Sequence, residues 1–383
     1  MIRILMVFGT RPEAIKMAPV VLALRQHGRV KIIVCVTGQH EEMLRGILEL
    51  FCIEPDITLR IMKEGRDLYD LTGVILSQMR DVISASEPDI VLVHGDTTTT
   101  LAASLAAFYQ KIPIGHIEAG LRTHNLLSPW PEEGNRSIVG RLAKFHFAPT
   151  EVNRDNLLAE GVAPEGIYVT GNTVIDALQF VLRRFVHDKS RRVKAEEAIH
   201  AAGYSFTSRK LILITGHRRE NFGIGFENIF SAVRALANRF PLVDFVYPVH
   251  LNPGVIGPAQ LLLGGIANIH LIQPLPYEPF VLLMERCHFI LTDSGGIQEE
   301  GPSLGKPVLV TRDSTERPEG VNAGTVRLVG TDIDLIVSSA SLLLEHSDSY
   351  IAMSRAHNPY GDGQAAKVIA SSLVEALNVC FDI

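Results

Sequence analysis

The chain has 383 residues, of which 46% are hydrophobic and 20% are charged, and its formal net charge is −6. This length exceeds what one ordinary hydrophobic core fills, so two domains are expected. The composition is that of a globular protein rather than a disordered one, and the negative balance argues against nucleic acid or an anionic membrane surface as partners.

The cysteines and the apolar runs bear on where the protein works. Cys35, Cys52, Cys287 and Cys380 are far apart and form no C-x-x-C pair, which favours buried thiols in a reducing compartment over disulfides or a metal site. No apolar run approaches the roughly 18 residues that span a bilayer. The chain opens directly with a strand-like segment that lacks a signal-peptide pattern. We therefore expect a cytoplasmic protein with no membrane partner.

The first half of the chain alternates short apolar runs with helical patterns. The apolar runs predict buried parallel strands, and they lie at residues 2–8, 31–37, 89–94, 113–119 and 144–149. Helices are expected between them, at residues 12–26, 67–85, 97–109 and 150–158. This alternation predicts a doubly wound α/β domain.

The second half repeats the alternation after a charged helical segment at residues 183–209. Its predicted strands lie at residues 210–215, 243–247, 268–272, 288–292 and 307–310. Its predicted helices lie at residues 225–238, 258–263, 278–286 and 296–304. The second half is therefore also expected to be an α/β domain.

The two halves predict two α/β domains, which we place at residues 1–171 and 172–361. A long amphipathic helix is expected after them, at residues 363–379. Two such domains would face each other across a cleft. Ligands bind open parallel sheets at the carboxyl ends of the strands, so functional residues are expected there.

The first strand ends in Gly9, and Pro12 suits the first position of the helix that follows. Arg11 and Lys16 could face a phosphate from this helix start, although a well-capped helix with two surface cations is the plainer alternative. The segment contains neither a Walker A loop nor a G-x-G-x-x-G fingerprint. No motif therefore supports a P-loop or a nicotinamide site.

Two later strands of the first domain end in carboxylates beside glycines. Asp96 and Glu118 both stand in apolar surroundings, where burial raises the pKa of a carboxyl group and suits it to proton transfer. Asp96 could instead cap the next helix. Glu132 and Arg136 follow in the next loop, one helical turn apart, and could form only an ion pair.

The second domain carries features that suit an anion. His217 and Arg218 follow a strand end, and residues 293–320 begin with a Ser-Gly-Gly turn before a helix that carries Glu300. Backbone N–H groups at such a turn approach phosphates closely, and a carboxylate one turn later can bind ribose hydroxyls. A nucleoside diphosphate is therefore the expected ligand. The alternative is an ordinary βα turn with basic and solvated charged loops.

Together these motifs closely resemble those of the bacterial non-hydrolysing UDP-N-acetylglucosamine 2-epimerases. The matching segments cover essentially the whole chain and read FGTRPEAIKMAP, VLVHGDTTTTLAASLAAFYQ, GHIEAGLRT, SPWPEEGNR, TGNTVIDAL, TGHRREN, YPVHLNP, LTDSGGIQEEGPSLGKPVLV, ERPEG, AGTVRLVGTD and AMSRAHNPYGDGQA. The resemblance implies two Rossmann-like domains of the glycosyltransferase-B type facing a cleft, with the last helix, at about 362–383, packing back on the first domain.

The resemblance also implies an activity. The protein would be a homodimeric isomerase that interconverts UDP-GlcNAc and UDP-ManNAc, supplying ManNAc-type sugars for cell-surface polysaccharides. The C–H bond at C2 of the sugar is not next to a carbonyl group, so direct proton removal would be prohibitively slow. Anti elimination of UDP gives 2-acetamidoglucal, and UDP then adds back with protonation from the opposite face. This route needs no NAD and no metal, in agreement with the missing fingerprints.

By motif, the resemblance assigns roles to individual residues. The catalytic group comprises Asp96, Glu118, Glu132, Arg136 and His217. Contacts with the UDP part of the substrate are assigned to Arg11, Lys16, Phe280, Ser294, Gly295, Gly296, Glu300 and Arg317.

Two departures from the family pattern concern nucleotide binding. Some members bind a second UDP-GlcNAc as an activator, and Gln39, Arg218 and His250 match positions associated with that site. Glu42 stands where a second glutamine occurs in some members. Leu275 likewise replaces a glutamine before the Tyr-x-Pro-Phe motif, which leaves the hydrogen bonding of the uracil base open.

Three other functions are compatible with these features. A glycosyltransferase on the same fold would need an acceptor site, and a hydrolysing relative would release free ManNAc and UDP. A UDP-sugar-binding sensor would bind the ligand without turnover. The carboxylates at the strand ends argue against the sensor.

Overall fold

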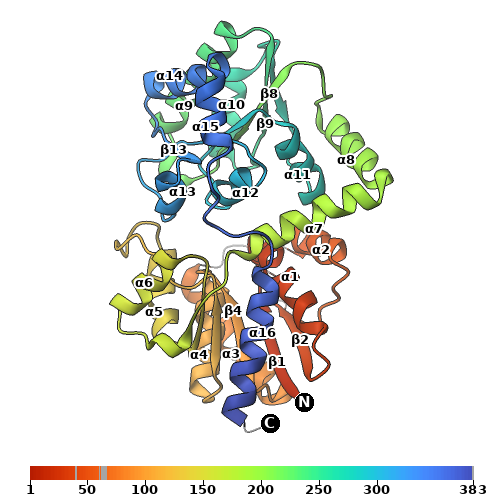
Figure 1. The fold of residues 1–383 in the computed structure, drawn as a ribbon, viewed down its shortest axis with the longest axis vertical. Helices are drawn as coiled ribbons and strands as arrows, with labels where there is room; N and C mark the ends of the chain where they lie inside the picture. The colour runs from red at the N-terminus through yellow and green to blue at the C-terminus, as the bar shows by residue number, and fades with distance from the viewer. Residues whose placement is uncertain (39–40, 60, 62–66, 382–383) are drawn as a thin grey trace. The chain divides into compact units, whose positions relative to one another are not determined.

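The computed structural model describes residues 1–38, 41–59, 61 and 67–381. The chain divides into two compact units, Met1–Ala177 with Tyr360–Ile383 and Leu178–Pro359 (Figure 1). The division falls within helix α7 (Thr173–His187), whereas the sequence places it just before that helix, between residues 171 and 172. The predicted fold class, α/β with parallel sheets, is confirmed.

The first unit is built on a seven-stranded parallel sheet in the order β3-β2-β1-β4-β5-β6-β7. Its strands are β1 (Ile2–Phe8), β2 (Val30–Val36), β3 (Ile57–Thr58), β4 (Ile90–His94), β5 (Ile114–Ile117), β6 (Phe145–Ala148) and β7 (Ile167–Val169). Leu5 and Val7 pack in one core cluster, and the alternating residues Ile4 and Met6 are equally buried. A strand covered on both faces needs apolar residues at every position, which explains the continuous apolar runs.

Helices of the first unit connect these strands. They are α1 (Arg11–Arg25), α2 (Glu41–Leu50), α3 (Leu68–Ser86), α4 (Thr98–Tyr109), α5 (Glu132–Leu142) and α6 (Glu151–Ala159), with the short helix η1 (Pro164–Gly166). The last helix, α16 (Ala365–Phe381), packs along α1 (Figure 1). Asp176 of α7 accepts hydrogen bonds from the N–H groups of Ala365 and Ala366, which satisfies the free donors at the start of α16.

The second unit contains a six-stranded parallel sheet in the order β10-β9-β8-β11-β12-β13. Its strands are β8 (Lys210–Thr215), β9 (Val243–Pro248), β10 (Ile269–Ile272), β11 (Phe289–Thr292), β12 (Val308–Val310) and β13 (Val326–Leu328). Thr292 at the end of β11 pairs with Thr215 of β8 and with Val310 of β12. The register therefore brings the loops after these three strands to one edge of the sheet.

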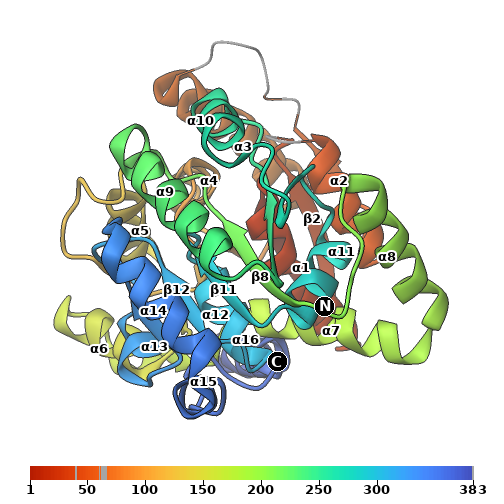
Figure 2. The ribbon, with the colours of Figure 1, turned by 90° about the horizontal axis from the view of Figure 1, so that it is seen from above.

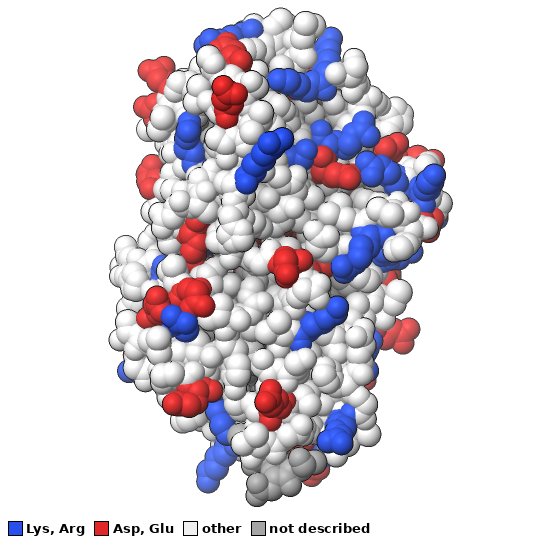
Figure 3. Space-filling view, in the orientation of Figure 1, with Lys and Arg blue, Asp and Glu red and all other residues white. Residues whose placement is uncertain are grey.

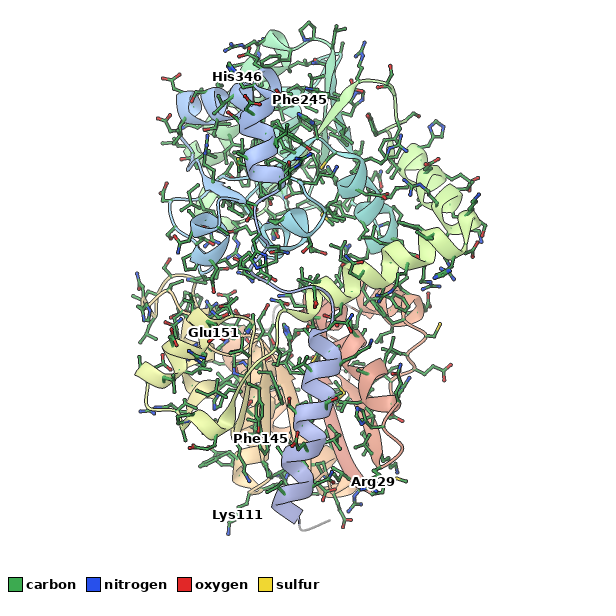
Figure 4. The ribbon with its side chains drawn as sticks, in the orientation of Figure 1. Arg29, Lys111, Phe145, Glu151, Phe245 and His346 are labelled. Carbon is green, nitrogen blue, oxygen red and sulfur yellow. The ribbon has the colours of Figure 1, made fainter. Side chains whose placement is uncertain are left out.

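Helices cover both faces of the second sheet. They are α8 (Lys189–Ala202), η2 (Arg219–Asn221), α9 (Ile224–Arg239), α10 (Pro253–Leu263), α11 (Tyr277–Arg286), α12 (Ile297–Ser303), α13 (Pro318–Asn322), α14 (Ile333–Glu345) and α15 (Ser347–Ser354). Helices α9 and α14 lie on one side of strands β8 and β11, and α8 and α11 lie on the other (Figure 2). Phe245 of β9, labelled in Figure 4, is buried with Phe226 and Phe230 of α9 in the main core of this unit.

The face drawn in Figure 3 carries no single dominant charge. Lys and Arg side chains are interspersed with Asp and Glu over the face drawn in Figure 3, in keeping with the net charge of −6. Within the described residues, no helix combines the length and apolar character that crossing a membrane requires.

Helix α12 lies close to the second sheet because Gly301 has no side chain. A Cβ atom at this position would come within 2.6 Å of Cγ2 of Val308 and 3.2 Å of Cδ1 of Ile290. Both neighbours belong to buried strands, so neither can move away cheaply. Gly301 therefore determines how far Glu299 and Glu300, on the same helix, stand from the strand ends.

We expect the substitution Gly301→Ala to lower the free energy of unfolding by about 1–3 kcal/mol, because the added methyl group overpacks the contact between α12 and the sheet. Gly257→Ala is the matched control. Gly257 is an exposed helical glycine, and a Cβ atom added there would have none of the described atoms outside its own helical turn within 4 Å, so alanine should be neutral or stabilising by up to about 1 kcal/mol. Urea denaturation of both variants measures the difference, and equal effects would contradict the close-packing argument.

Candidate active site

The start of α1 is fixed by a buried carboxylate that the sequence analysis did not single out. Glu13 accepts hydrogen bonds from the N–H groups of Gly9 and Thr10, at 3.0 and 2.7 Å, and from the hydroxyls of Thr97 and Thr100, at 2.7 and 3.2 Å. Burial raises the pKa of Glu13, and these donors lower it in part. Thr10 and Glu13 form a capping box, a T-x-x-E pattern that is visible in the sequence. Glu13 thus ties the start of α1 to the start of α4.

Glu118 lies at the end of β5 among three polar side chains. Its Oε1 atom pairs with the ammonium of Lys16 and accepts a hydrogen bond of 2.8 Å from Nδ2 of Asn172. Nε2 of His94 is 3.7 Å from Oε2. The sequence predicts that Lys16 faces a phosphate, and the structure adds this buried carboxylate as a protein partner of its ammonium group.

The backbone of Glu118 is in the left-handed region, with φ of +63°. Such a conformation costs a non-glycine residue roughly 1–3 kcal/mol and persists only where the surroundings determine it. Gly120, two residues on, has φ of +88°, and a Cβ atom there would lie 2.2 Å from the carbonyl oxygen of Asn153. The sharp turn after β5 therefore aims the carboxylate of Glu118 at Lys16 and Asn172 rather than along the strand.

Asp96 follows the end of β4 and is held through its backbone. Its carbonyl oxygen accepts a hydrogen bond of 2.8 Å from Nδ2 of Asn135. Nε2 of His116 donates to the carbonyl oxygen of the preceding Gly95, at 2.7 Å. Burial lowers the pKa of His116 to about 3, which keeps this ring neutral. The turn that carries Asp96 is thus fixed from two neighbouring elements.

The carboxyl group of Asp96 titrates in an unusual range. Its pKa is raised to about 6 and burial is the main cause; the charge of Arg136 lowers it, the charges of Glu118 and Glu132 raise it, and that of Lys16 lowers it. The side chain still keeps 32% of its surface exposed, so a small molecule can reach it. A carboxyl group with this pKa exchanges protons close to neutral pH, which is what general acid–base chemistry needs.

Arg136 lies buried on α5 between two carboxylates. Its Nη1 atom is 3.5 Å from Oδ2 of Asp96, and its Nη2 atom is 3.2 Å from Oε2 of Glu133. Glu133 also accepts hydrogen bonds of 3.0 Å from the N–H groups of Thr123 and His124. The helical ion pair of Arg136 is therefore made with Glu133, not with Glu132 as the sequence suggested. Glu132 stays half-buried at the start of the helix.

In the second unit, the turn after β11 is closely packed. Ser294 donates its N–H to the hydroxyl of Thr292 at 2.9 Å, and Gly296 stands at the start of α12. A Cβ atom at Gly295 would lie 2.6 Å from Nη1 of Arg317. Glycine is required here because the guanidinium of Arg317 occupies the space of a side chain.

Arg317 belongs to a buried network of alternating charges. Its guanidinium pairs with Glu299 and Glu316, and Glu316 pairs in turn with Arg312, which contacts Glu220. Burial raises the pKa of Glu316, but the facing arginines outweigh it and hold this pKa well below its ordinary value. The network links the loops after β8 and β12 to α12. The sequence predicts Arg317 as a phosphate ligand, and the structure adds these two protein partners.

Glu300 of α12 is oriented by a tyrosine that the sequence analysis did not assign. The hydroxyl of Tyr277 donates to Oε1 of Glu300 at 2.8 Å, and both residues are buried. Phe280 is half-buried on the same helix as Tyr277, α11. Leu275, before that helix, is buried. The predicted ribose and base contacts therefore come from α11 and α12.

His217 lies after β8 with 45% of its side-chain surface exposed. Its ring stacks on that of His250, with centroids 5.2 Å apart and planes at 16°. Arg218 lies 3.7 Å from Glu316. Of the three residues predicted for an activator site, His250 therefore contacts the predicted site residue His217, Arg218 faces the Glu316 that pairs with Arg317, and Gln39 lies outside the described residues.

The predicted site residues thus form one group in each unit. Among the described ones, Asp96, Glu118, Glu132, Arg136, Lys16 and Arg11 belong to the first unit, and the others belong to the second. Within the first group, the structure brings Asp96, Glu118 and Glu132 close enough for their charges to interact. The sequence analysis gave no role to several supporting residues, although they lie within its motifs, and these are Asn172, Glu133, His116, Tyr277 and Asp293.

Arg136→Gln is expected to raise the pKa of Asp96 above about 6, because it removes the guanidinium whose charge lowers that pKa. Titration of the Asp96 carboxyl carbon by ¹³C NMR measures this change. Arg141→Gln is the matched control, since Arg141 is exposed on the same helix and donates to the carbonyl oxygen of Glu160. An unchanged pKa in Arg136→Gln would show that the arginine does not act on Asp96.

Comparison with known proteins identifies close relatives over nearly the whole chain. The family model described as UDP-N-acetylglucosamine 2-epimerase matches residues 22–374. The probable UDP-N-acetylglucosamine 2-epimerase of Ralstonia solanacearum is 59% identical over 371 residues, which cover 97% of this chain and 98% of that protein.

Solved structures give the same result. The crystal structure of UDP-GlcNAc 2-epimerase from Neisseria meningitidis bound to UDP-GlcNAc is similar with a TM-score of 0.94 at 53% identity, covering 98% of this chain and 100% of the other. The Methanocaldococcus jannaschii UDP-GlcNAc 2-epimerase in complex with UDP-GlcNAc and UDP has a TM-score of 0.85 at 30% identity, covering 98% and 100%. The glycosyltransferase SnogD from Streptomyces nogalater, with a TM-score of 0.52 at 16% identity and coverage of 97% and 99%, is alike in fold alone.

Proposed function

Since the chain belongs to the UDP-N-acetylglucosamine 2-epimerase family, a family of isomerases, we propose that it interconverts UDP-GlcNAc and UDP-ManNAc by inverting C2 of the sugar. The observation that carries this proposal is the carboxylate group around Asp96, whose pKa of about 6 suits proton transfer. The product would serve as a precursor of ManNAc-type sugars in cell-surface polysaccharides.

The reaction proceeds by elimination and re-addition. The C2 proton leaves to a carboxylate as the anomeric C–O bond breaks in the anti direction, which gives 2-acetamidoglucal and UDP. UDP then adds back at the anomeric carbon while a proton is delivered to the opposite face of C2. Two proton-transfer groups are sufficient, and this chemistry requires neither a nicotinamide nor a metal ion.

Asp96, Glu118 and Glu132 supply the proton-transfer groups. Lys16 and Asn172 stabilise the ionised form of Glu118, which is the form that accepts a proton. Asp96 exchanges a proton near neutral pH because of its raised pKa. When the reaction runs in reverse, the carboxyl group that acted as the acid becomes the base, and the one that acted as the base becomes the acid. Arg136 limits the build-up of negative charge among these carboxylates.

The second unit holds UDP while it is detached from the sugar. Ser294, Gly295 and Gly296 offer backbone N–H groups at the start of α12 for the diphosphate. Glu300, oriented by Tyr277, binds the ribose hydroxyls, and Phe280 contacts the uracil. His217, Arg11 and Arg317 neutralise the charge of the phosphates. The same protein would act as a homodimer, with Gln39, Arg218 and His250 contributing to a second UDP-GlcNAc site.

When UDP-GlcNAc is incubated with the protein alone, ¹H NMR should record UDP-ManNAc appearing over time. Each competing function predicts a different spectrum. A glycosyltransferase would leave UDP-GlcNAc unchanged without an acceptor, a hydrolysing enzyme would release free ManNAc in step with UDP, and a sensor would show thermal stabilisation without turnover. Any of these three results would replace the epimerase proposal.

In D₂O the product should carry deuterium at C2, because the abstracted proton exchanges with solvent before the intermediate is protonated. Mass spectrometry and the loss of the C2 proton signal measure this incorporation. Retention of the original hydrogen at C2 in the product would contradict elimination through a carboxylate in contact with solvent.

The neutral variants Asp96→Asn, Glu118→Gln and Glu132→Gln should each lower kcat by about 10²- to 10⁴-fold with little change in KM, as expected for acid–base groups. Glu165→Gln is the matched control, since Glu165 is exposed in the same unit. Steady-state kinetics measure the effect. Near wild-type kcat in all three variants would show that these carboxylates do not transfer the protons.

A further inference from the structure

Asp293 anchors the loop that carries His217. This carboxylate is fully buried at the end of β11, and its Oδ2 atom accepts hydrogen bonds from the N–H groups of His217 and Arg218, both at 2.9 Å. Nδ2 of Asn221 donates to the same oxygen at 3.3 Å. One carboxylate oxygen therefore fixes the backbone of the loop after β8.

The other oxygen of Asp293 has a different environment. Oδ1 is buried and accepts no hydrogen bond from the described residues, and the Nδ1 atom of His217 lies 3.7 Å from it. This distance is too long for a hydrogen bond, and a small rotation of the exposed imidazole would close it. A buried acceptor without a donor carries a cost that a proton on Nδ1 would remove. The hydrogen bonds that Asp293 accepts from the loop after β8 all end on Oδ2, so they do not depend on Oδ1.

The groups around His217 come from three strand ends. Asp293 follows β11, His250 stacks on the ring from the loop after β9, and Arg218 is the next residue of the same loop. The pKa of His217 is lowered overall: desolvation lowers it most, Asp293 raises it and so offsets part of that effect, and His250 and Arg218 lower it further. Tyr247 of β9 lies beneath, where burial raises its pKa and keeps the phenol neutral. Asp293 is thus the one carboxylate among these groups that favours the imidazolium.

We propose that Asp293 is a positioning residue that holds the proton on Nδ1 of His217 and stabilises the imidazolium, so that the Nε2–H group faces the departing diphosphate. The inference rests on the proposed function for the identity of that diphosphate. A carboxylate that orients an imidazole in this way fixes both its tautomer and its direction. Charge that develops on the leaving group then meets a donor that is already in place.

The plainer role for Asp293 is to anchor the loop, and two variants separate it from the proposed one. Asp293→Asn keeps one oxygen for the N–H groups of His217 and Arg218 but removes the negative charge beside Nδ1. Asn221→Ala removes one anchor of the same loop, including its hydrogen bond to the carbonyl oxygen of Thr311, and leaves that charge in place.

The experiment measures the pKa of His217 by ¹⁵N-histidine NMR in the full chain, together with the pH dependence of kcat. In Asp293→Asn the pKa of His217 should fall, because a stabilising negative charge is lost. In this variant the decline of kcat with rising pH should therefore begin at a lower pH than in the unaltered protein. Above that pH, kcat of the variant should be about 10- to 100-fold lower than that of the unaltered protein. Asn221→Ala should leave the pKa of His217 where it is.

Three results would overturn the proposal. They are an unchanged pKa of His217 in Asp293→Asn, an equal shift in both variants, and full additivity of Asp293→Asn with His217→Gln in kcat. The titration does not depend on turnover. If the protein made no UDP-ManNAc, the proposed function would be wrong, but the pKa of His217 would still test the role of Asp293.

A measurement on the unaltered protein covers the case in which Asp293→Asn does not fold. The ¹⁵N shifts of His217 should report a protonated Nδ1 in the free protein and protons on both nitrogens when UDP is added. An unprotonated Nδ1 in the presence of UDP would contradict the proposal.

Discussion

Charges buried at strand ends are the constraint on which the candidate site depends. Lys16 faces Glu118, Arg136 lies between Asp96 and Glu133, and Arg317 is held by Glu299 and Glu316. A buried charge without a partner costs several kcal/mol, and removing one member of such a pair typically destabilises by about 3–5 kcal/mol. The loops after the strands are therefore determined by the need to keep each charge paired. Gly120 and Gly295 stand where those loops come too close to other groups for any side chain.

Much of the fold was predictable from the sequence because its strands are buried on both faces. Continuous apolar runs identified β1, β2, β4, β5 and β6 and five strands of the second sheet. Strands β3, β7 and β13 were missed: each is only two or three residues long, and unlike the equally short β12 (Val308–Val310) none is an unbroken run of aliphatic residues. Glu132 and Glu133 illustrate a second limit. Adjacent residues on a helix point in different directions. Which of the two is buried depends on how α5 is rotated about its own axis relative to the sheet.

Partners within the site were predictable only where they are local. The capping box of Thr10 and Glu13 is a pattern within four residues, whereas Lys16 and Glu118 are 102 positions apart. Their contact follows from the order of the strands, because β1 and β5 both adjoin β4. The partners of Asp293 likewise depend on the pairing of β8 with β11. Sequence motifs predicted which residues belong to the site, and the sheet order determined what each of them touches.

Both units position their functional groups by the same means. In the first unit, His116 of β5 holds the carbonyl oxygen of Gly95 after the neighbouring strand β4, and so fixes Asp96. In the second, Asp293 after β11 holds the N–H group of His217 after the neighbouring strand β8. In each case a side chain from one strand end fixes the backbone at the next. Proton transfer requires donors and acceptors within hydrogen-bond reach, and a loop free to move would not maintain that geometry. Because parallel strands end at the same edge of the sheet, a side chain from one loop can hydrogen-bond to the backbone of the next. The sheet therefore determines how closely the positions of the site residues are fixed.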